Sequence, residues 1–134
     1  MIPLAVGDRF SASMQPVAQP QINQFGALLG THGPIHTDPE FAKTTFLKGV
    51  VVQGGVLLAP VHDFMCQLVG EDRWLRHGWM EAKIVSYTRP EDATRYELQV
   101  EALDDKELKL SVACTKDADT KVMVASITVG LAGD

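Results

Sequence analysis

The sequence predicts an α+β fold in which a long antiparallel sheet wraps around one central helix. Three observations lead to this prediction. Apolar residues recur at helical spacing in the first half of the chain, and they alternate with polar residues in the second half. Short polar turns separate the alternating segments. Because a long apolar helix precedes these strands, we expect the sheet to cover that helix.

The first half predicts two helices ahead of the central one. Pro20 suits a first helical position, and Gly30 is the expected C-terminal stop of the same helix. A short helix through Lys43 is expected after Asp38, because that carboxylate can accept from the N–H groups of a helix start. The apolar face of the first helix consists of Ile22, Phe25, Ala27, Leu28 and Leu29.

The central helix is predicted to follow Gln53-Gly54-Gly55. Pro60 removes one helical hydrogen bond, so we expect the helix to begin later than Gly55 or to bend at the proline. Gly70 is expected to end it. The apolar face is broad enough to be buried against a sheet, and it consists of Val56, Leu57, Val61, Phe64, Met65, Leu68 and Val69.

The second half predicts a strand over residues 79–88, closed by Arg89-Pro90. Three further strands follow, over residues 95–102, 108–114 and 123–131. Their side chains alternate between apolar and polar, as in half-buried strands. Because short turn-like segments join these three strands, we expect an antiparallel meander.

Composition indicates an ordinary globular chain with one domain over residues 1–134. The net charge is −5 without a basic stripe, so nucleic acid is not an expected partner. Cys66 and Cys114 lie far apart without a metal-ligand spacing, which favours reduced thiols and a cytoplasmic location. Since we find neither a signal-peptide pattern nor an apolar stretch long enough for a bilayer, no membrane partner is expected.

The most specific motif lies between residues 30 and 57. Gly30 is followed by Pro34-Ile35-His36, Asp38, Ala42, Thr44 and Phe46, and then by Gly54 and Leu57. Together with Val6-Gly7-Asp8 and Arg89-Pro90, this order resembles the MaoC-like (R)-specific enoyl-CoA hydratases and (3R)-hydroxyacyl dehydratases. The resemblance covers nearly the whole chain. It implies the hot-dog fold, in which a long sheet wraps around one helix.

Three positions depart from the family pattern. Thr31 stands where the family has its catalytic aspartate, Gly33 replaces an asparagine, and Gln53 replaces the histidine before the helix glycine. A hydroxyl can hydrogen-bond to water but cannot accept its proton near neutral pH. The resemblance therefore implies a hydratase site in which the usual Asp/His pair is incomplete.

His36 is the candidate base, because an imidazole pKa of about 6.5 suits proton transfer at neutral pH. Thr31 would position water or a substrate hydroxyl. Gly54 and Gly55 would let the thioester oxygen approach the free N–H groups at the start of the central helix. The structural alternatives are a packed histidine and a loose glycine turn.

His32 and Gln53 are auxiliary candidates, the first as a substitute base and the second as a residue that reshapes the pocket. His32 and His36 have a metal-compatible spacing only on a regular helix, and Pro34 excludes one there. No metal is therefore predicted.

The expected function is hydration or dehydration of an acyl thioester, a reaction type of fatty acid metabolism. CoA or the phosphopantetheine of acyl-carrier protein would belong to the substrate, and no other cofactor is expected. A related reaction that needs one base, such as isomerisation or thioester hydrolysis, is a variant of this hypothesis. The alternative is a non-catalytic or half-active subunit. In either case a homodimer, or a heterodimer with a second hot-dog chain, would cover an open sheet edge.

Overall fold

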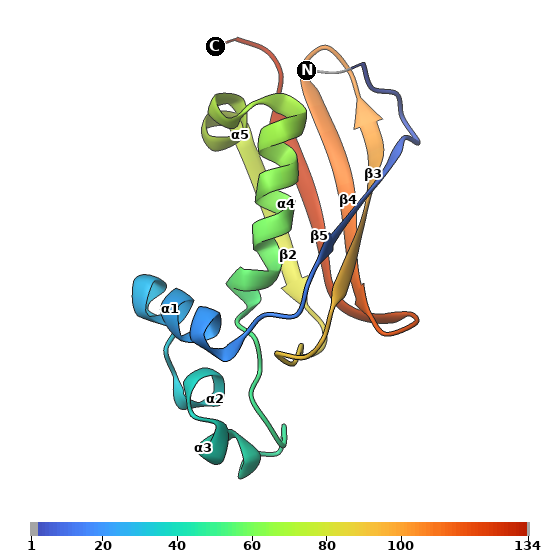
Figure 1. Cartoon of the computed structure of the whole chain (residues 1–134). Coiled ribbons are helices and arrows are strands. Elements are labelled where there is room, and N and C mark those ends of the chain that lie inside the picture. Colours follow the sequence, from blue (N-terminus) through green and yellow to red (C-terminus); the bar gives the residue numbers. More distant parts are fainter. Residues whose placement is uncertain (1–2, 134) are drawn as a thin grey trace.

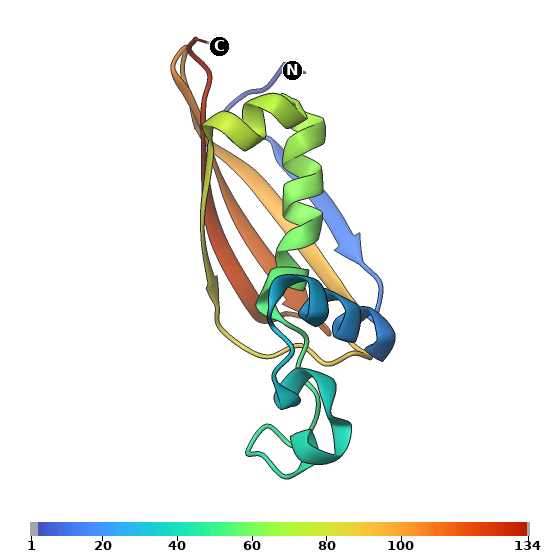
Figure 2. The ribbon, with the colours of Figure 1, turned by 90° about the vertical axis from the view of Figure 1, so that its left-hand side faces the viewer.

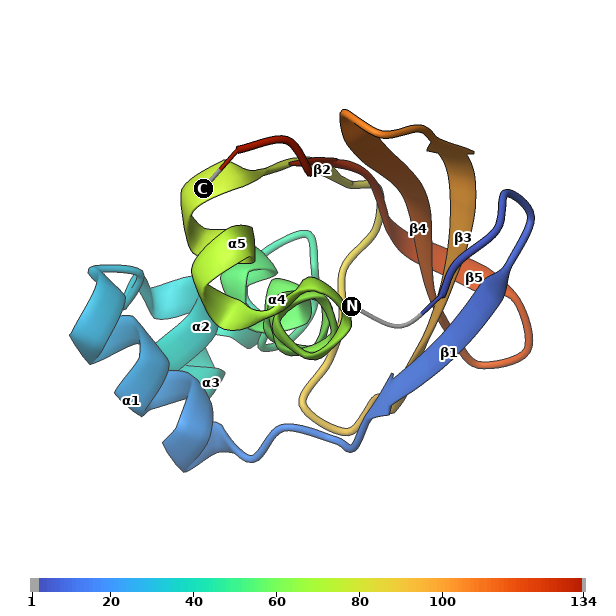
Figure 3. The same ribbon diagram turned by 90° about the horizontal axis from the view of Figure 1, so that it is seen from above.

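A five-stranded antiparallel sheet curls around one long helix, α4 (Gly54–Val69). The computed structural model describes residues 3–133. Viewed along α4, the sheet curves past one side of the helix from β2 to β1 (Figure 3). The strands are β1 (Arg9–Met14), β2 (Gly78–Ile84), β3 (Thr94–Leu103), β4 (Glu107–Lys116) and β5 (Thr120–Gly130), in the spatial order β1-β3-β4-β5-β2. This arrangement confirms the predicted α+β architecture.

The helices before the sheet follow the local signals of the sequence. Helix α1 (Gln19–Leu29) ends at Gly30, whose φ of 76° is a left-handed conformation that favours glycine. Helix α3 (Pro39–Lys43) begins after Asp38, whose carboxylate accepts from the N–H of Phe41 at 3.2 Å. Both predicted helices and both of these end signals are confirmed.

Helix α4 differs from one of the two predicted alternatives. It begins at Gly54 and runs through Pro60 to Val69, so a start after Gly55 is wrong, and a bend at Pro60 stays a prediction. Pro60 has no N–H, so the 16-residue helix loses one main-chain hydrogen bond there. The sheet buries the apolar face of the helix along its length. Tertiary packing therefore outweighs the local cost of the proline. Gly70 ends the helix, as predicted, with a φ of 92°.

The predicted meander of the last three strands is confirmed, since β3 pairs with β4 and β4 pairs with β5. Strand β2 pairs with β5 and ends at Ile84, earlier than predicted. The chain then turns toward the start of α4, where the Thr88 carbonyl accepts from the N–H of Val52 at 2.7 Å. The sequence patterns did not predict β1, α2 (Pro34–Thr37) or α5 (Glu71–His77).

Two apolar clusters hold these elements together. The larger lies between α4 and the sheet and includes Leu57, Met65 and Leu98, each at most 1% exposed. The smaller lies under α1 and α3 and includes Ile22, Ala42 and Val52. Helices α1, α2 and α3 gather at the N-terminal end of α4, beyond the sheet (Figures 1 and 2). The second cluster therefore attaches three short helices to the place where α4 begins.

Tyr96 joins the sheet to α4 by a polar contact inside the larger cluster. Its side chain is buried, and its hydroxyl donates to the main-chain carbonyl of Leu57 at 2.6 Å. Cys114 lies opposite Tyr96 on the neighbouring strand. Burial raises the pKa of the Tyr96 phenol and also that of the Cys114 thiol, so both side chains are neutral in the folded protein at neutral pH.

Replacement of Tyr96 tests this buried contact. We expect Tyr96→Phe to lower the free energy of unfolding at pH 8 by about 0.5–1.5 kcal/mol, because one buried hydrogen bond is lost. The phenol of the wild type stabilises the fold fully below its unfolded-state pKa of about 10. This contribution falls by up to about 1.4 kcal/mol per pH unit as pH rises further, because only the unfolded chain releases the proton. Urea unfolding should therefore show the two proteins converging between pH 8 and pH 11; a constant gap would contradict a neutral, buried Tyr96.

Candidate functional site

The loop after α1 places Thr31 at the N-terminal end of α4. The N–H groups of Gly30 and Thr31 both donate to the Gly26 carbonyl, the latter at 3.0 Å. These bonds close the C-terminus of α1 and turn the chain back along it. Thr31 itself is exposed, and no hydrogen bond of its hydroxyl is found among residues 3–133. Main-chain contacts therefore define where Thr31 lies.

Gln53 connects this loop to the central helix. Its Nε2 donates to the carbonyls of Ile22 at 2.8 Å and Thr31 at 3.2 Å. Carbonyl oxygens only accept, so these contacts determine which end of the amide faces α1. The side chain is 2% exposed, and its Oε1 has no hydrogen-bond partner within the described chain. The predicted auxiliary residue thus joins α1, the Thr31 loop and the start of α4.

Gly26 allows this close approach. It is buried, and a Cβ built on it would lie 2.9 Å from the Thr31 carbonyl oxygen and 3.0 Å from the Cα of His32. The same Cβ would lie 3.2 Å from Nε2 of Gln53. Gly26 is not among the residues that the sequence patterns single out, although a glycine inside an apolar helical pattern is a known signal of close packing.

His36 lies on α2, and its ring is oriented by the main-chain carbonyl of Val51. Its Nδ1 is 2.6 Å from the Val51 carbonyl oxygen, and its own carbonyl accepts from Nε2 of Gln19 at 2.7 Å. Because a carbonyl oxygen can only accept, Nδ1 must carry a proton. In the neutral imidazole, Nε2 then has a free lone pair. The geometry therefore gives His36 the tautomer that a base acting through Nε2 requires.

The start of α4 supplies N–H donors close to these residues. Within residues 3–133 no hydrogen bond is found for the N–H groups of Gly54 and Gly55, whereas that of Val56 donates to the Gln53 carbonyl at 3.0 Å. A Cβ on Gly54 would lie 3.2 Å from the Ile84 side chain. One on Gly55 would lie 2.8 Å from the Phe25 ring. The two glycines thus also make room for neighbouring side chains, which is a structural reason for them.

The structure brings most of the predicted site residues to one end of α4. Thr31 contacts Gln53 directly, and His36 contacts Val51, which precedes Gly54 in the segment entering the helix. His32 follows Thr31, but its side chain is exposed, and only its main chain packs against α1. The arrangement offers an imidazole, a hydroxyl and free N–H donors within one short region. No group of three or more His, Cys, Asp or Glu side chains suited to a metal ion occurs in residues 3–133.

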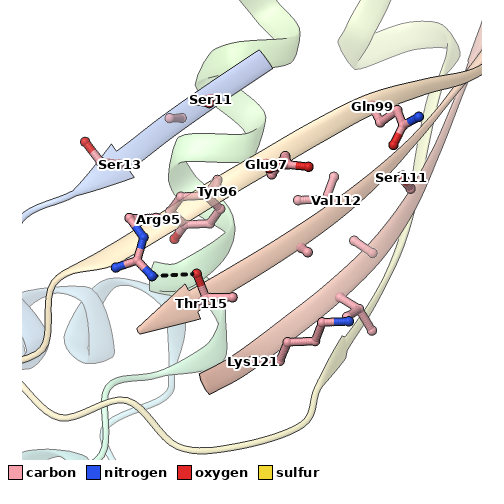
Figure 4. A pocket seen from close by; sticks show the side chains of 14 residues that line it. Ser11, Ser13, Arg95, Tyr96, Glu97, Gln99, Ser111, Val112, Thr115 and Lys121 are labelled. Carbon is pink, nitrogen blue, oxygen red and sulfur yellow. Dashed lines mark hydrogen bonds between the residues drawn. The ribbon is translucent and has the colours of Figure 1, made fainter. Parts of the chain in front are cut away.

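Two cavities lie elsewhere. One of about 860 Å³ is on the outer face of the sheet, lined by Ser11, Arg95 and Glu97 among others, with α4 behind the sheet (Figure 4). The other, of about 580 Å³, lies between the β1–α1 connection and α4 and includes Phe25 and Pro60. The predicted site residues line neither cavity. Thr31 and His32 are exposed, His36 is half-buried and Gln53 is buried, so in a single chain the candidate site is open to solvent on its Thr31 side.

A sequence profile of the MaoC-like domain matches residues 4–122. The chain belongs to the MaoC-like hydratase and dehydratase family. A search of curated proteins finds no significant match. Within the described residues, no helix is long and apolar enough to cross a membrane.

Solved structures share the fold. An (R)-hydratase from A. caviae involved in PHA biosynthesis is 21% identical with a TM-score of 0.82, over 96% of this chain and 98% of that one. The R-hydratase PhaJ1 from Pseudomonas aeruginosa is 18% identical with a TM-score of 0.80, over 94% and 81%. A chain of the ChsH1-ChsH2 complex from Mycobacterium tuberculosis is 12% identical with a TM-score of 0.78, over 96% and 98%. These similarities confirm the predicted hot-dog fold.

Gly26→Ala tests whether the Thr31 loop needs the close approach to α1. The added methyl should collide with the Thr31 carbonyl and with Gln53, at an overpacking cost of about 1–3 kcal/mol. Alanine recovers about 1 kcal/mol of helix propensity, so we expect a net loss of up to about 2 kcal/mol in the free energy of unfolding. Urea unfolding measures this change.

Gly33→Ala is the matched control for Gly26→Ala. Gly33 has a φ of −59°, and a Cβ built on it meets nothing within 4 Å. We expect its free energy of unfolding to stay within about 0.5 kcal/mol of the wild type. Equal losses in the two variants would show that the packing of Gly26 is not the cause.

Proposed function

We propose that this chain catalyses the reversible addition of water to a trans-2-enoyl thioester, with His36 as the base. The contact that carries the proposal is the hydrogen bond from Nδ1 of His36 to the Val51 carbonyl. It leaves Nε2 free to accept a proton, on a residue at the same end of α4 as the unpaired N–H groups of Gly54 and Gly55. Membership of a hydratase and dehydratase family supports the same reaction type.

The chemical steps follow from this placement. Nε2 of His36 takes a proton from water while the water oxygen forms a bond to the β-carbon. The electron pair of the carbon–carbon double bond moves toward the thioester and places negative charge on its oxygen. The N–H groups of Gly54 and Gly55 donate to that oxygen, and one such donor typically contributes about 3–4 kcal/mol at the transition state. The imidazolium then returns the proton to the α-carbon, so that a 3-hydroxyacyl thioester results.

Thr31 has a lesser role in this proposal. Its hydroxyl can hold the water, or the substrate hydroxyl in the reverse direction, but it cannot act as a base. A general base typically contributes about 10²–10⁴-fold, so the absence of the family's carboxylate should slow the reaction by a factor within that range. His32 is the auxiliary candidate to replace it. A single-base reaction of the same substrates, such as isomerisation or thioester hydrolysis, is the variant to test alongside.

The proposed substrate is an acyl-CoA or an acyl-carrier-protein thioester, and no cofactor beyond the substrate's own phosphopantetheine is required. The proposed assembly is a dimer that pairs the outer edge of β2. In the described sheet this strand has one neighbour, β5, and Trp79 on it is 68% exposed. An unpaired edge of this kind favours pairing with another chain. Such a partner would also cover the exposed side of the candidate site.

The second candidate function is a non-catalytic or half-active subunit of a heteromeric hydratase. The observation that favours it is Thr31, a hydroxyl at a position where the resembling family has its aspartate. The structural similarity to a chain of the two-protein ChsH1-ChsH2 complex is consistent with it. Native mass spectrometry separates the two candidates: a stable homodimer with turnover supports the enzyme, and a requirement for a second hot-dog chain supports the subunit.

His36→Ala tests the proposed base. We expect it to abolish hydration of short trans-2-enoyl-CoA substrates, measured by the loss of enoyl absorbance, with a fall in kcat of at least about 10²-fold. His32→Ala tests the auxiliary candidate in the same assay: a fall in kcat there would assign His32 a share of the base function, and a wild-type kcat would leave that function to His36. An unchanged rate in His36→Ala would disprove the assignment of the base.

Thr31→Asp tests whether the geometry around the missing carboxylate is intact. The main chain at this position is held by Gln53 and Gly26, so the new carboxylate should start from the same backbone position. We expect kcat for hydration to rise, up to the factor of about 10²–10⁴ that a general base contributes. Thr31→Asn has a similar shape without the basic group and should give no rise. A rise in both variants would point to a change in shape rather than to a restored base.

A further inference from the structure

The segment from Leu47 to Val52 enters α4 and is held on one side by the connection between β2 and β3. The N–H of Val52 donates to the Thr88 carbonyl at 2.7 Å. The guanidinium of Arg89 donates to the carbonyl of Val50 at 3.3 Å and also to that of Leu47. We call residues 47–52 the strap. Three hydrogen bonds therefore attach the strap to Thr88 and Arg89.

The strap contacts the candidate base on its other side. The N–H of Val51 donates to the Ile35 carbonyl at 3.2 Å, and the Val51 carbonyl accepts from Nδ1 of His36 at 2.6 Å. The main-chain groups of Val51 thus bond to α2, whereas its two neighbours bond to Thr88 and Arg89. Arg89 and His36 therefore bond to adjacent residues of the same short segment.

Arg89 is itself held in place. Its main-chain N–H donates to the Asp92 carboxylate at 2.8 Å, and its guanidinium lies 4.5 Å from the centre of the Tyr87 ring. Lys116 lies over the same ring at 4.2 Å and bonds to Asp92 at 3.3 Å. A Cβ built on Gly49 would lie 2.7 Å from Nη1, so the strap approaches the guanidinium as closely as a glycine allows. These contacts leave the guanidinium little freedom.

We propose that Arg89 is a positioning residue for His36, which acts by holding the Val51 carbonyl against Nδ1. The proposal rests on the proposed role of His36 as the base. A planar guanidinium can reach two carbonyls at once, which a lysine ammonium on a flexible stem does less well. When the Val51 carbonyl moves away from Nδ1, the neutral imidazole of His36 can carry its proton on Nε2 instead. Nε2 can then no longer accept a proton from water.

Arg89→Gln is the test, with the protonation of His36 read by NMR of the chain labelled with ¹⁵N-histidine. The signal of His36 among the 4 histidines is assigned by its loss in His36→Ala. At pH 8 we expect one tautomer, with the proton on Nδ1, in the wild type and a mixture of tautomers in Arg89→Gln. Hydration should fall by about 10–100-fold in kcat, with KM changed far less, as expected for a misplaced catalytic group. Arg89→Lys should lie between the two in both measurements.

Arg95→Gln is the matched control. Arg95 on β3 also donates to a main-chain carbonyl, that of Ala118 at 2.9 Å in the β4–β5 hairpin, and within the described residues it has no hydrogen bond to the strap. In Arg95→Gln, the His36 tautomer and the kcat for hydration should equal those of the wild type. If Arg89→Gln does not fold, Gly49→Ala displaces the same contact from the strap side and should give the same mixture of tautomers.

A folded Arg89→Gln that keeps one His36 tautomer and the wild-type kcat would overturn the proposal. The NMR result does not depend on turnover. If the wild type has no hydration activity, the proposed function fails, while the tautomer measurement still decides whether Arg89 positions His36.

Discussion

Burial of α4 is the constraint on which the rest of the structure depends. The helix has apolar residues on a broad face, and Leu57, Val61 and Met65 are each at most 1% exposed under the sheet. A flat sheet would leave much of such a face in water, so the five strands curl around it, from β2 to β1 (Figure 3). The N-terminal end of α4 lies at the rim of the sheet, where α1, α2 and α3 gather around it (Figure 2). The candidate site lies at the end of the fold that the sheet does not enclose.

The contacts at this end share one chemical feature. In each of them a side-chain donor binds a main-chain carbonyl. Gln53 donates to Ile22 and Thr31, His36 to Val51, and Arg89 to the strap. Loops without regular pairing expose carbonyl oxygens that need donors when they are partly buried. These donors therefore stabilise the loops and orient the candidate groups at the same time. The site depends on backbone positions more than on contacts between side chains.

The sequence predicts the elements whose signals are local. Gly30 and Asp38 define helix ends through their own conformation or side chain, and the alternating pattern of the last three strands follows directly from burial of one face. Strand β1 was missed because its small residues, such as Ser11 and Ala12, give a weak apolar alternation. Helix α5 was missed because Trp74 is buried by tertiary contacts, including a hydrogen bond from its indole to His62 at 3.2 Å.

For the candidate site, the sequence offers residues and a location, whereas the contacts between those residues come from the structure. The motif around His36 identified the family and therefore the helix end where the residues meet. It could not show that Gln53 reaches back to Ile22, or that Arg89 reaches Leu47, since these contacts join residues far apart in the chain. Gln53 was expected to shape the pocket, whereas its amide holds the Thr31 loop through a main-chain carbonyl. Every residue type has a main-chain carbonyl, so Gln53 can make this contact with threonine, asparagine or aspartate at position 31. The position of the main chain at residue 31 is therefore set independently of the side chain there, so the architecture of this loop and the chemistry of residue 31 can vary separately.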